Sequence, residues 1–280
     1  MNLFFNNQFY PVSTPLFLAA NRAYRFGEGI FETMLWLNGR ICFGTDHFQR
    51  LHNGMQLLGI QPPPHFTLAA VEDVVARLVQ QNGHQNAARI RLSVTCGNGM
   101  LNQYDEQGFE WLVESFEINI LPTRFSQTGL TTRLFTAARK NTDALSAFKT
   151  ASHLVYALAA RHAVNLKLND CIILNTGGMV CDSSIANLFM IKGNEIITPS
   201  LSGGCIAGVF RKNLLQKAPE LGYSVTERDI YPAELETTGE LFLTNVIRGI
   251  CSVGQFEDKQ YESAATAAFA QKILPRLYNP

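Results

Sequence analysis

The sequence has no surplus of charge of either sign, and this limits the partners it can have. Lys and Arg together number 23, and Asp and Glu also number 23. Proteins that bind nucleic acid or an anionic membrane surface carry a basic surplus or a basic stripe. We therefore expect a small-molecule substrate, with no nucleic-acid partner and no membrane partner.

Paired cysteines and long apolar runs are also missing. The six cysteines form no C-x-x-C pair, which argues against a zinc site and, in a chain of this length, against a disulfide framework. We expect buried thiols in a reducing compartment, the cytoplasm, and no bound metal. No window approaches the ~18 apolar residues of a membrane span, and the opening MNLFFNNQFY lacks the basic start of a secretory signal. The cysteines are Cys42, Cys96, Cys171, Cys181, Cys205 and Cys251.

The length allows two lobes, and the pattern of elements predicts them. Single cores stop growing near ~250–300 residues, so a chain of 280 residues, 46% of them hydrophobic, can form two lobes as readily as one. Strand, hairpin, helix, helix, strand and strand patterns follow one another up to Leu121 and predict a small α+β domain over residues 1–121. The Asn38-Gly39 pair is a strong signal for a two-residue hairpin. The polar residues 122–129 are the predicted linker, and residues 130–280 form the predicted larger domain, which opens with a strand at 130–137.

The stretch from Asp170 to Arg211 holds the most chemical information in the larger domain. Two short apolar runs, 171–174 and 186–191, predict strands, and Asp182 lies between them in apolar company. The glycine-rich residues 202–208 lead into a helix that starts near Val209 and is predicted to continue to Leu221. Because a helix start presents unpaired N–H groups and the positive end of the dipole, it can bind an anion. In the alternative interpretation, the glycines only turn the chain.

Two basic residues are further candidates for chemistry. Lys149 stands just before a predicted helix in apolar surroundings, where desolvation would lower its pKa from ~10.4 toward the range of an amine nucleophile. Its stem could instead pack while the ammonium reaches solvent. Arg50 lies on a predicted helix that begins at Asp46 and could be an ordinary solvated arginine.

Seven motifs follow one another along nearly the whole chain: FGEGIFETM, DHFQRL, RIRLSVTCGNG, FKTASHL, DSSIANLF, IAGVFR and LTNVIRGI. In this order they resemble the class IV aminotransferase family, pyridoxal-phosphate enzymes of fold type IV. That family includes branched-chain aminotransferases, D-amino acid aminotransferases and aminodeoxychorismate lyase. The resemblance implies a two-lobed α+β and α/β fold with a small α+β domain and a larger pseudo-barrel domain, and a homodimer in which a neighbour's loop closes each site.

The resemblance implies a role for each matched position. Lys149 would form the Schiff base with pyridoxal 5'-phosphate and move the proton at the substrate α-carbon. Asp182 would pair with the pyridine nitrogen. Arg50 and the backbone N–H groups of Val209 and Phe210 would hold the phosphate.

Other positions are assigned to the phosphate side and to the substrate. Thr244 and Asn245, in the LTNVIRGI turn, match a second phosphate-side loop. The candidate substrate contacts are Phe31, Tyr104, His153 and Arg248.

Three positions depart from the common family pattern. Most members have glutamate where this chain has Asp182, so the side chain is one methylene shorter. Phe210 stands where transaminases often have a threonine, which leaves only its backbone donor. His153 occupies a place often held by tyrosine.

The reaction is predicted from smaller differences. The short chain and the turn with Asn245 look more like aminodeoxychorismate lyase, which releases pyruvate and forms 4-aminobenzoate. The loop 97–105 lacks the extra arginine and histidine of D-amino acid aminotransferases. The alternatives are a transaminase that uses branched-chain or D-amino acids with 2-oxoglutarate, and a binding module without turnover, against which Lys149 argues. A nucleotide site at Gly27-Glu28-Gly29 has little support, because neither GxGxxG nor GxxxxGK[ST] occurs. Arg25, Arg89, Arg91 and Arg248 are candidate partners for a substrate carboxylate.

Overall fold

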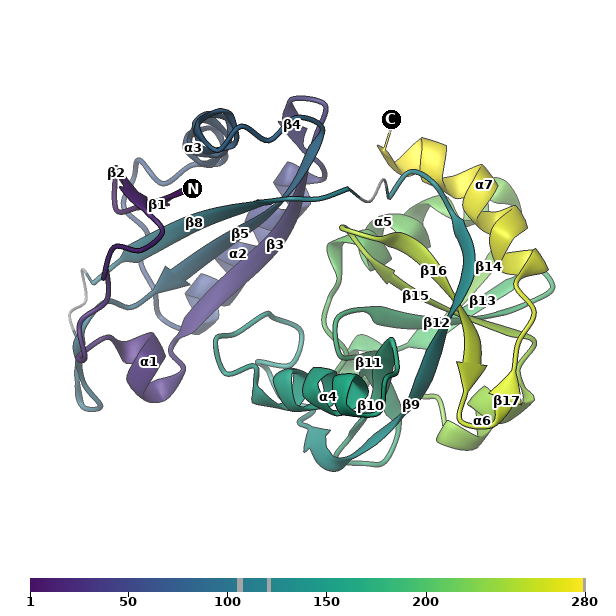
Figure 1. The fold of residues 1–280 in the computed structure, drawn as a ribbon. Coiled ribbons are helices and arrows are strands. Elements are labelled where there is room, and N and C mark those ends of the chain that lie inside the picture. Colours follow the sequence, from purple (N-terminus) through teal and green to yellow (C-terminus); the bar gives the residue numbers. More distant parts are fainter. Residues whose placement is uncertain (105–107, 120–121, 279–280) are drawn as a thin grey trace. The chain divides into compact units, whose positions relative to one another are not determined.

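The structure, a computed structural model, describes residues 1–104, 108–119 and 122–278. The chain divides into two compact units (Figure 1). Unit 1 comprises residues 1–120 and 148–152, and unit 2 comprises residues 121–147 and 153–280. The short segment 148–152, which carries Lys149, therefore groups with unit 1, whereas the sequence-based division assigned it to the larger domain.

Unit 1 is built on a six-stranded antiparallel sheet in the order β2-β1-β8-β5-β3-β4. A separate pair, β6 and β7, forms a small second sheet. The elements are β1 (Asn2–Phe5), β2 (Gln8–Pro11), α1 (Arg22–Phe26), β3 (Gly29–Leu37), β4 (Arg40–Ile41), α2 (Gly44–Leu57), α3 (Leu68–Gln81), β5 (Ala87–Thr95), β6 (Gly99–Met100), β7 (Gln103–Tyr104) and β8 (Glu110–Glu117).

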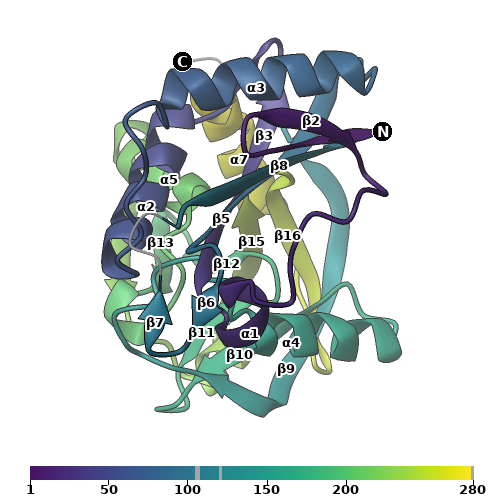
Figure 2. The ribbon, with the colours of Figure 1, turned by 90° about the vertical axis from the view of Figure 1, so that its left-hand side faces the viewer.

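The core of unit 1 lies between one face of this sheet and two helices. Alternate strand residues such as Ile30, Met34 and Ile90 point to that face, because side chains alternate across a strand. Helix α2 packs on β3, and α3 crosses β1 and β8, as Figure 2 shows. The intervening strand residues, Phe31 and Arg91 among them, point to the opposite face.

The predicted hairpin in unit 1 is confirmed. Asn38 and Gly39 both have positive φ, 51° and 81°, and they join β3 to β4 with Leu37 opposite Arg40. Positive φ at both central residues is the geometry that asparagine followed by glycine favours in a two-residue turn.

Unit 2 is built on a nine-stranded mixed sheet in the order β11-β10-β9-β16-β15-β12-β13-β14, with β17 paired to β16. The edge strand β11 also approaches β12 and β13, so the sheet curves into a half-barrel. The elements are β9 (Ser126–Lys140), α4 (Leu154–Asn165), β10 (Asp170–Asn175), β11 (Val180–Ser183), β12 (Asn187–Lys192), β13 (Glu195–Pro199), the 3-10 helix η1 (Leu201–Gly203), α5 (Val209–Lys217), η2 (Pro219–Leu221), β14 (Ser224–Arg228), α6 (Pro232–Thr237), β15 (Glu240–Asn245), β16 (Gly249–Phe256), β17 (Lys259–Gln260) and α7 (Ala264–Tyr278).

The helices of unit 2 cover different parts of its sheet. Inside the curve, buried aliphatic residues such as Leu188, Leu243 and Val253 form one core. Helix α4 packs against β9 and β10, and helices α5 and α7 pack on β15 and on each other (Figure 1). Helix α5 is therefore packed between the sheet and α7.

Two elements of unit 2 differ from the predicted ones. Strand β9 begins at Ser126, inside the predicted linker, and continues to Lys140, three residues beyond its predicted end at Ala137. Backbone pairing with β16 and β10 extends it through polar residues. Helix α5 ends at Lys217 because Pro219 has no N–H to continue it, so the helix predicted up to Leu221 is shorter.

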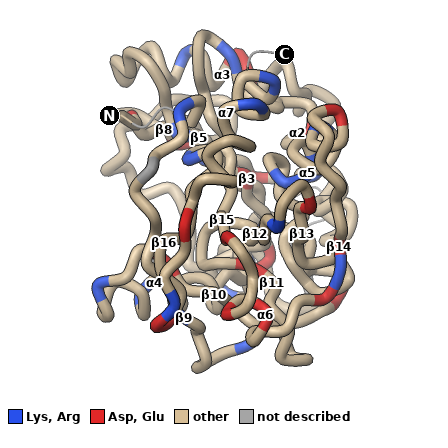
Figure 3. The backbone as a smooth tube through the Cα atoms, turned by 90° about the vertical axis from the view of Figure 1, so that its right-hand side faces the viewer, with Lys and Arg blue, Asp and Glu red and all other residues tan. Residues whose placement is uncertain are grey.

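Charges are spread over the chain without separation by sign. Basic and acidic segments are interspersed along the tube in Figure 3. Several of them pair locally, as Arg211 does with Glu227 and Arg228 with Glu234. In the part of the chain that the structure describes, no helix is both long and apolar enough to cross a membrane.

Candidate functional site

Asp182 in β11 is a buried carboxylate that receives hydrogen bonds on both oxygens. Its exposed fraction is 1%. Oδ2 accepts from Tyr156 O–H at 2.6 Å, Ile206 N–H at 2.9 Å and Lys140 Nζ at 3.2 Å. Oδ1 accepts from Asn187 Nδ2 at 2.9 Å, its single donor among the described residues. Because a carboxylate oxygen can accept more than one hydrogen bond, Oδ1 keeps capacity for a further N–H donor such as a protonated ring nitrogen.

Tyr156 connects Asp182 to His153. Burial raises the pKa of Tyr156 well above its ordinary value, and the negative charge of Asp182 adds to the effect. The phenol therefore stays protonated and donates a hydrogen bond to the carboxylate. His153, the residue before α4, stacks on Tyr156 with ring centroids 4.2 Å apart and planes 8° apart. The structure thus brings two of the predicted site residues, His153 and Asp182, into one network.

Asn187 ties Asp182 to the start of α5. Its Nδ2 also donates to the carbonyl of Ile206 at 2.9 Å. Its side-chain oxygen lies so close to Gly208 that a Cβ built there would be 1.9 Å from it. Only glycine fits at position 208, and this close approach fixes the start of the helix relative to Asp182.

The first turn of α5 has the features of an anion site. Gly208 is extended, with φ −60° and ψ 132°, and its position has no side-chain cap. The N–H groups of Val209 and Phe210 lie in the first turn, at the positive end of the helix dipole. The ring of Phe210 is buried and lies 5.9 Å from the Tyr278 ring, so only its backbone can face a ligand.

Thr244 adds a hydroxyl on the same sheet face. It lies opposite Asn187 in the β12–β15 pair, and paired residues in an antiparallel ladder point to the same face. Its Oγ1 is buried and has no hydrogen-bond partner among the described residues. A buried hydroxyl without a partner is costly, so it fits a site whose ligand supplies the missing acceptor. Asp182, the start of α5 and Thr244 together have the donors and the acceptor that a phosphorylated pyridine requires.

Asn245 and Arg248 shape the neighbouring turn. Asn245 Oδ1 accepts from the N–H groups of Ile247 at 3.0 Å and Arg248 at 2.9 Å, and its Nδ2 donates to the Ile185 carbonyl at 3.2 Å. These bonds fix the turn after β15. Asn245 and Arg248 also line a small cavity of about 10 Å³ beside Asp170, which is room for about one water molecule.

Arg50 in unit 1 lies on the face of α2 that points to the sheet. Its Nε and Nη2 donate to the two oxygens of Glu32 at 2.7 and 2.5 Å. His47, one turn earlier, has Nδ1 2.7 Å from Glu32 Oε2. Burial alone raises the pKa of Glu32, but the Arg50 charge and the hydrogen bonds from His47 and Arg50 outweigh it and lower that pKa to about 2. Arg50 is therefore not the solvated helix arginine of the alternative interpretation.

Lys149 lies in unit 1 beside Phe31. The Phe31 N–H donates to the Lys149 carbonyl at 2.8 Å, and the Lys149 Nζ lies 4.8 Å from the centre of the Phe31 ring. The guanidinium carbon of Arg91 lies 3.8 Å from the same ring. Phe31 and Arg91 line a cavity of about 540 Å³ on this sheet face, a volume suited to a small-molecule substrate.

The structure distributes the predicted residues over the two units. Asp182, His153, Val209, Phe210 and Thr244 are in unit 2, with Asn245 and Arg248 in the adjoining turn. Unit 1 contains Arg50, Phe31 and Lys149. Arg50 lies on the face of the sheet that α2 covers, and Phe31 points to the opposite face. Tyr104 belongs to β7, but its side chain lies outside the described residues.

Sequence reasoning did not identify four residues of these networks. Lys140, Tyr156 and Asn187 surround Asp182, and Glu32 holds Arg50. The FETM and ANLF motifs contained Glu32 and Asn187, so both could have been found as polar residues within apolar strands. Lys140 gave no such signal, because its position depends on the length of β9.

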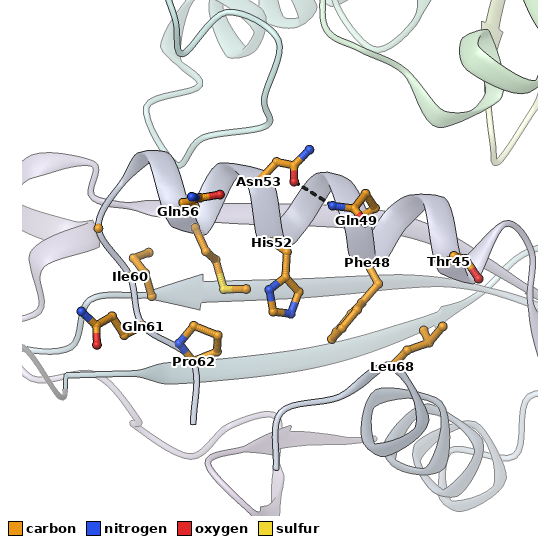
Figure 4. A pocket seen from close by; sticks show the side chains of 12 residues that line it. Thr45, Phe48, Gln49, His52, Asn53, Gln56, Ile60, Gln61, Pro62 and Leu68 are labelled. Carbon is orange, nitrogen blue, oxygen red and sulfur yellow. Dashed lines mark hydrogen bonds between the residues drawn. The ribbon is translucent and has the colours of Figure 1, made fainter. Parts of the chain in front are cut away.

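Another cavity of unit 1 lies away from these groups. About 730 Å³ in volume, it runs along α2 (Figure 4). Phe48, His52 and Leu68 point into it, and a hydrogen bond of 2.8 Å joins Gln49 to Asn53 at its rim. Arg50, on the other side of the helix, does not line it. Its lining contains no lysine, arginine or carboxylate, so it does not match a phosphorylated cofactor.

Comparison with known proteins identifies relatives over most of the chain. The model of the amino-transferase class IV family matches residues 29–256. An aminodeoxychorismate lyase from Bacillus subtilis is 27% identical over 257 residues, 89% of this chain and 84% of that protein. A mitochondrial branched-chain-amino-acid aminotransferase from Arabidopsis thaliana is 38% identical over 101 residues, but the match covers only 35% of this chain and 26% of that protein.

Solved structures share the fold. The branched-chain aminotransferase from Thermoproteus uzoniensis with norvaline has a TM-score of 0.88 at 19% identity, covering 100% of this chain and 95% of that one. A hypothetical aminotransferase from Mycobacterium tuberculosis in its pyridoxal-phosphate-bound form has a TM-score of 0.83 at 20% identity, with 99% of both chains covered. Both likenesses establish the two-domain fold with its half-barrel.

Proposed function

This chain belongs to the class IV aminotransferase family and is a pyridoxal-phosphate-dependent enzyme, and on that premise we propose that it is a 4-amino-4-deoxychorismate lyase. The observation that carries the specific reaction is the turn after β15, where Asn245 binds two backbone N–H groups. The match to the B. subtilis lyase over 84% of that protein supports the same reaction. The loop 97–105 also lacks the arginine and histidine expected of a D-amino acid aminotransferase.

We propose that the two ends of the cofactor are bound by different parts of unit 2. Asp182 accepts a hydrogen bond from the ring nitrogen, and the N–H groups of Val209 and Phe210 with the Thr244 hydroxyl bind the phosphate. The bond from Asn187 to Asp182 and its close approach to Gly208 support this pairing, because they fix the distance between the two ends. When bound, pyridoxal phosphate supplies an electron sink for the α-carbon of an amino substrate.

The roles proposed for unit 1 concern the reacting amine, the phosphate and the substrate. Lys149 would hold the cofactor through its side-chain amine and would move the proton at the substrate carbon, and Arg50 would contribute a positive charge to the phosphate. We propose that Arg91, rather than Arg248, receives a substrate carboxylate. Its position in the 540 Å³ cavity, against the Phe31 ring that also contacts Lys149, supports this choice.

The second candidate is an amino acid transaminase that uses branched-chain or D-amino acids with 2-oxoglutarate. Arg91 would serve it equally well, since 2-oxoglutarate is a dicarboxylate. We also propose a homodimer in the cytoplasm. The unpaired state of all six cysteines supports the reducing compartment, and exposed apolar side chains near α1, including Leu18 and Tyr24, support a subunit interface.

Two parallel assays test the reaction. The purified protein is given 4-amino-4-deoxychorismate in one assay, and branched-chain or D-amino acids with 2-oxoglutarate in the other. We expect 4-aminobenzoate and pyruvate in the first and no glutamate in the second. Glutamate formation without 4-aminobenzoate would identify the transaminase instead.

A further inference from the structure

Lys140 is a buried lysine at the end of β9 that lies outside the matched family motifs. Only 7% of it is exposed, and lysine is rarely this buried unless its charge is paired. Its ammonium donates to Asp182 Oδ2 at 3.2 Å and to the carbonyl of Ser146 at 2.8 Å. It also lies 5.0 Å from the centre of the Tyr156 ring, a cation–π distance.

Ser146 belongs to a loop that leads along the chain toward Lys149. Its hydroxyl donates to the carbonyl of Asn141 at 2.7 Å and accepts from the N–H of Asp143 at 3.0 Å. Ala147, the next residue, accepts a hydrogen bond of 2.9 Å from Ala207. Lys140 therefore joins the buried carboxylate to a loop that is fixed at both of its ends.

The other titratable groups that face Asp182 are neutral. Tyr156 keeps its proton, as described above. Burial raises the pKa of the Cys181 thiol well above its ordinary value and that of Cys205 to about 12, with the charge of Asp182 adding to both effects. Among the described residues, Lys140 is thus the one cation that is hydrogen-bonded to Asp182.

We propose that Lys140 is a positioning residue for the cofactor. Its ammonium pairs with Asp182 Oδ2 and with the Ser146 carbonyl, and these two bonds fix Oδ2 and the loop 141–147 so that Oδ1 faces the ring nitrogen. This inference rests on the proposed role of Asp182, and it adds a second lysine to a site in which only Lys149 reacts.

The test compares three variants after the wild-type protein has been shown to bind pyridoxal phosphate with a visible absorbance band. Lys140→Met removes the charge and keeps the length of the side chain, whereas Lys140→Arg keeps the charge. Lys192→Met removes an exposed lysine at the end of β12 and serves as the matched control. The readouts are the dissociation constant for pyridoxal phosphate and the pH midpoint of the visible band.

We expect Lys140→Met to weaken cofactor binding about 10- to 100-fold, the range for losing a hydrogen bond to a charged group. We expect its pH midpoint to rise, because the Asp182 carboxylate, no longer paired with the ammonium, then acts in full on the cofactor and favours its protonation. Lys140→Arg should keep the wild-type midpoint, and Lys192→Met should match wild type in both readouts. Equal midpoints in wild type and Lys140→Met, or equal changes in the Met and Arg variants, would overturn the proposal.

A double variant covers the case in which Lys140→Met alone does not fold, since replacing both members of a buried ion pair is better tolerated than removing one. If Lys140 acts through Asp182, then Lys140→Met in an Asp182→Asn background should not move the midpoint further. A further shift would show that Lys140 acts independently of the carboxylate. A wild-type protein that binds no pyridoxal phosphate would refute the proposed cofactor role of Asp182 itself, which is a different result.

Discussion

At the scale of single residues, the buried carboxylates differ in what stabilises their charge. Glu32 is paired with Arg50, and its pKa falls to about 2 although burial alone would raise it. Asp170 accepts from two backbone N–H groups and from the hydroxyls of Ser183 and Ser184, but from no cation among the described residues. Burial raises the pKa of Asp170 against those hydrogen bonds. The positive charge of Arg50 and the hydrogen bonds from Arg50 and His47 thus lower the pKa of Glu32, whereas burial raises the pKa of Asp170.

The pairing in unit 1 predicts a loss of stability in acid. Burial lowers the pKa of His47, so below pH 6.5 the unfolded state takes up a proton that the folded state does not. Glu32 adds a second loss as pH falls from 4.5 toward 2, and a shift of this size corresponds to roughly 3 kcal/mol. Urea midpoints followed by tryptophan fluorescence should fall accordingly, since Trp36 and Trp111 are both in unit 1.

A matched pair of variants separates the contribution of Glu32 from general acid effects. Glu32→Gln should lower stability at pH 7, because it removes the negative charge that pairs with the buried Arg50, and should flatten the curve below pH 4.5. Asp73→Asn removes one member of an exposed pair with Arg77 and should leave the curve unchanged. If the urea midpoints of wild type and Glu32→Gln fell in parallel with pH, this carboxylate would not be the cause of the loss of stability in acid.

A site residue could be predicted only where its neighbours in the sequence indicate its environment. Asp182 stood out as an acid among apolar residues, and the structure confirms its burial. Lys140 could not be recognised, because a lysine after a strand is ordinary until the strand is known to continue to position 140. Glu32 could be noticed as an acid within an apolar strand, but its pairing with Arg50 and His47 could not, since both partners lie on α2 and only the packing of that helix brings them to Glu32.

At the scale of elements, the start of α5 depends on one glycine. The extended backbone at Gly208 and the nearby Asn187 leave no room for a side chain. The same glycine places the first-turn N–H groups where a phosphate could accept from them. The lack of space at Gly208 therefore sets the position of the proposed anion site at the start of α5.

Gly208→Ala should damage this element. The added methyl would lie 1.9 Å from the Asn187 side-chain oxygen, so either the helix start or Asn187 must move. We expect the variant to bind pyridoxal phosphate at least about tenfold more weakly than wild type, because Asn187 and the first-turn donors cannot both keep their positions. Gly177→Ala, at an exposed turn, is the control and should bind normally. Unchanged affinity in Gly208→Ala would contradict the proposed phosphate site.

Elements were predictable where local chemistry decides them. The Asn38-Gly39 turn was predictable because this pair favours positive φ, which both residues adopt. The entry to α5 was predictable because its sequence is rich in glycine. The ends of β9 were not predictable, because pairing with β16 and β10 sets them. Pairing between distant segments has no local signal, and so the polar residues from Ser126 onward were assigned to a linker.

At the scale of the whole molecule, each unit contributes its own part of the proposed chemistry. Unit 1 carries Lys149 and the cavity with Arg91, and unit 2 carries Asp182 and the start of α5. The fold class was predictable because the motifs occur in order over nearly the whole chain, and the family match over residues 29–256 confirms it. The specific reaction stays a proposal, because relatives of this chain include both lyases and aminotransferases.

The exposed apolar side chains near α1 predict self-association. Leu18 and Tyr24 are 66% and 82% exposed, and Phe17 and Tyr24 line the 540 Å³ cavity. Burying such a patch in a second copy would remove apolar surface from water. Light scattering at micromolar concentration should give the mass of a dimer, and Leu18→Glu should shift it toward the monomer. A monomeric wild-type protein at that concentration would contradict the proposed assembly.

The most direct measurement of the central claim identifies the lysine that holds the cofactor. The protein is incubated with pyridoxal phosphate, reduced with borohydride, digested and mapped by mass spectrometry. We predict a phosphopyridoxyl group on Lys149, and none on Lys140 or in Lys149→Ala. A label on another lysine, or no label in the wild-type protein, would contradict the account.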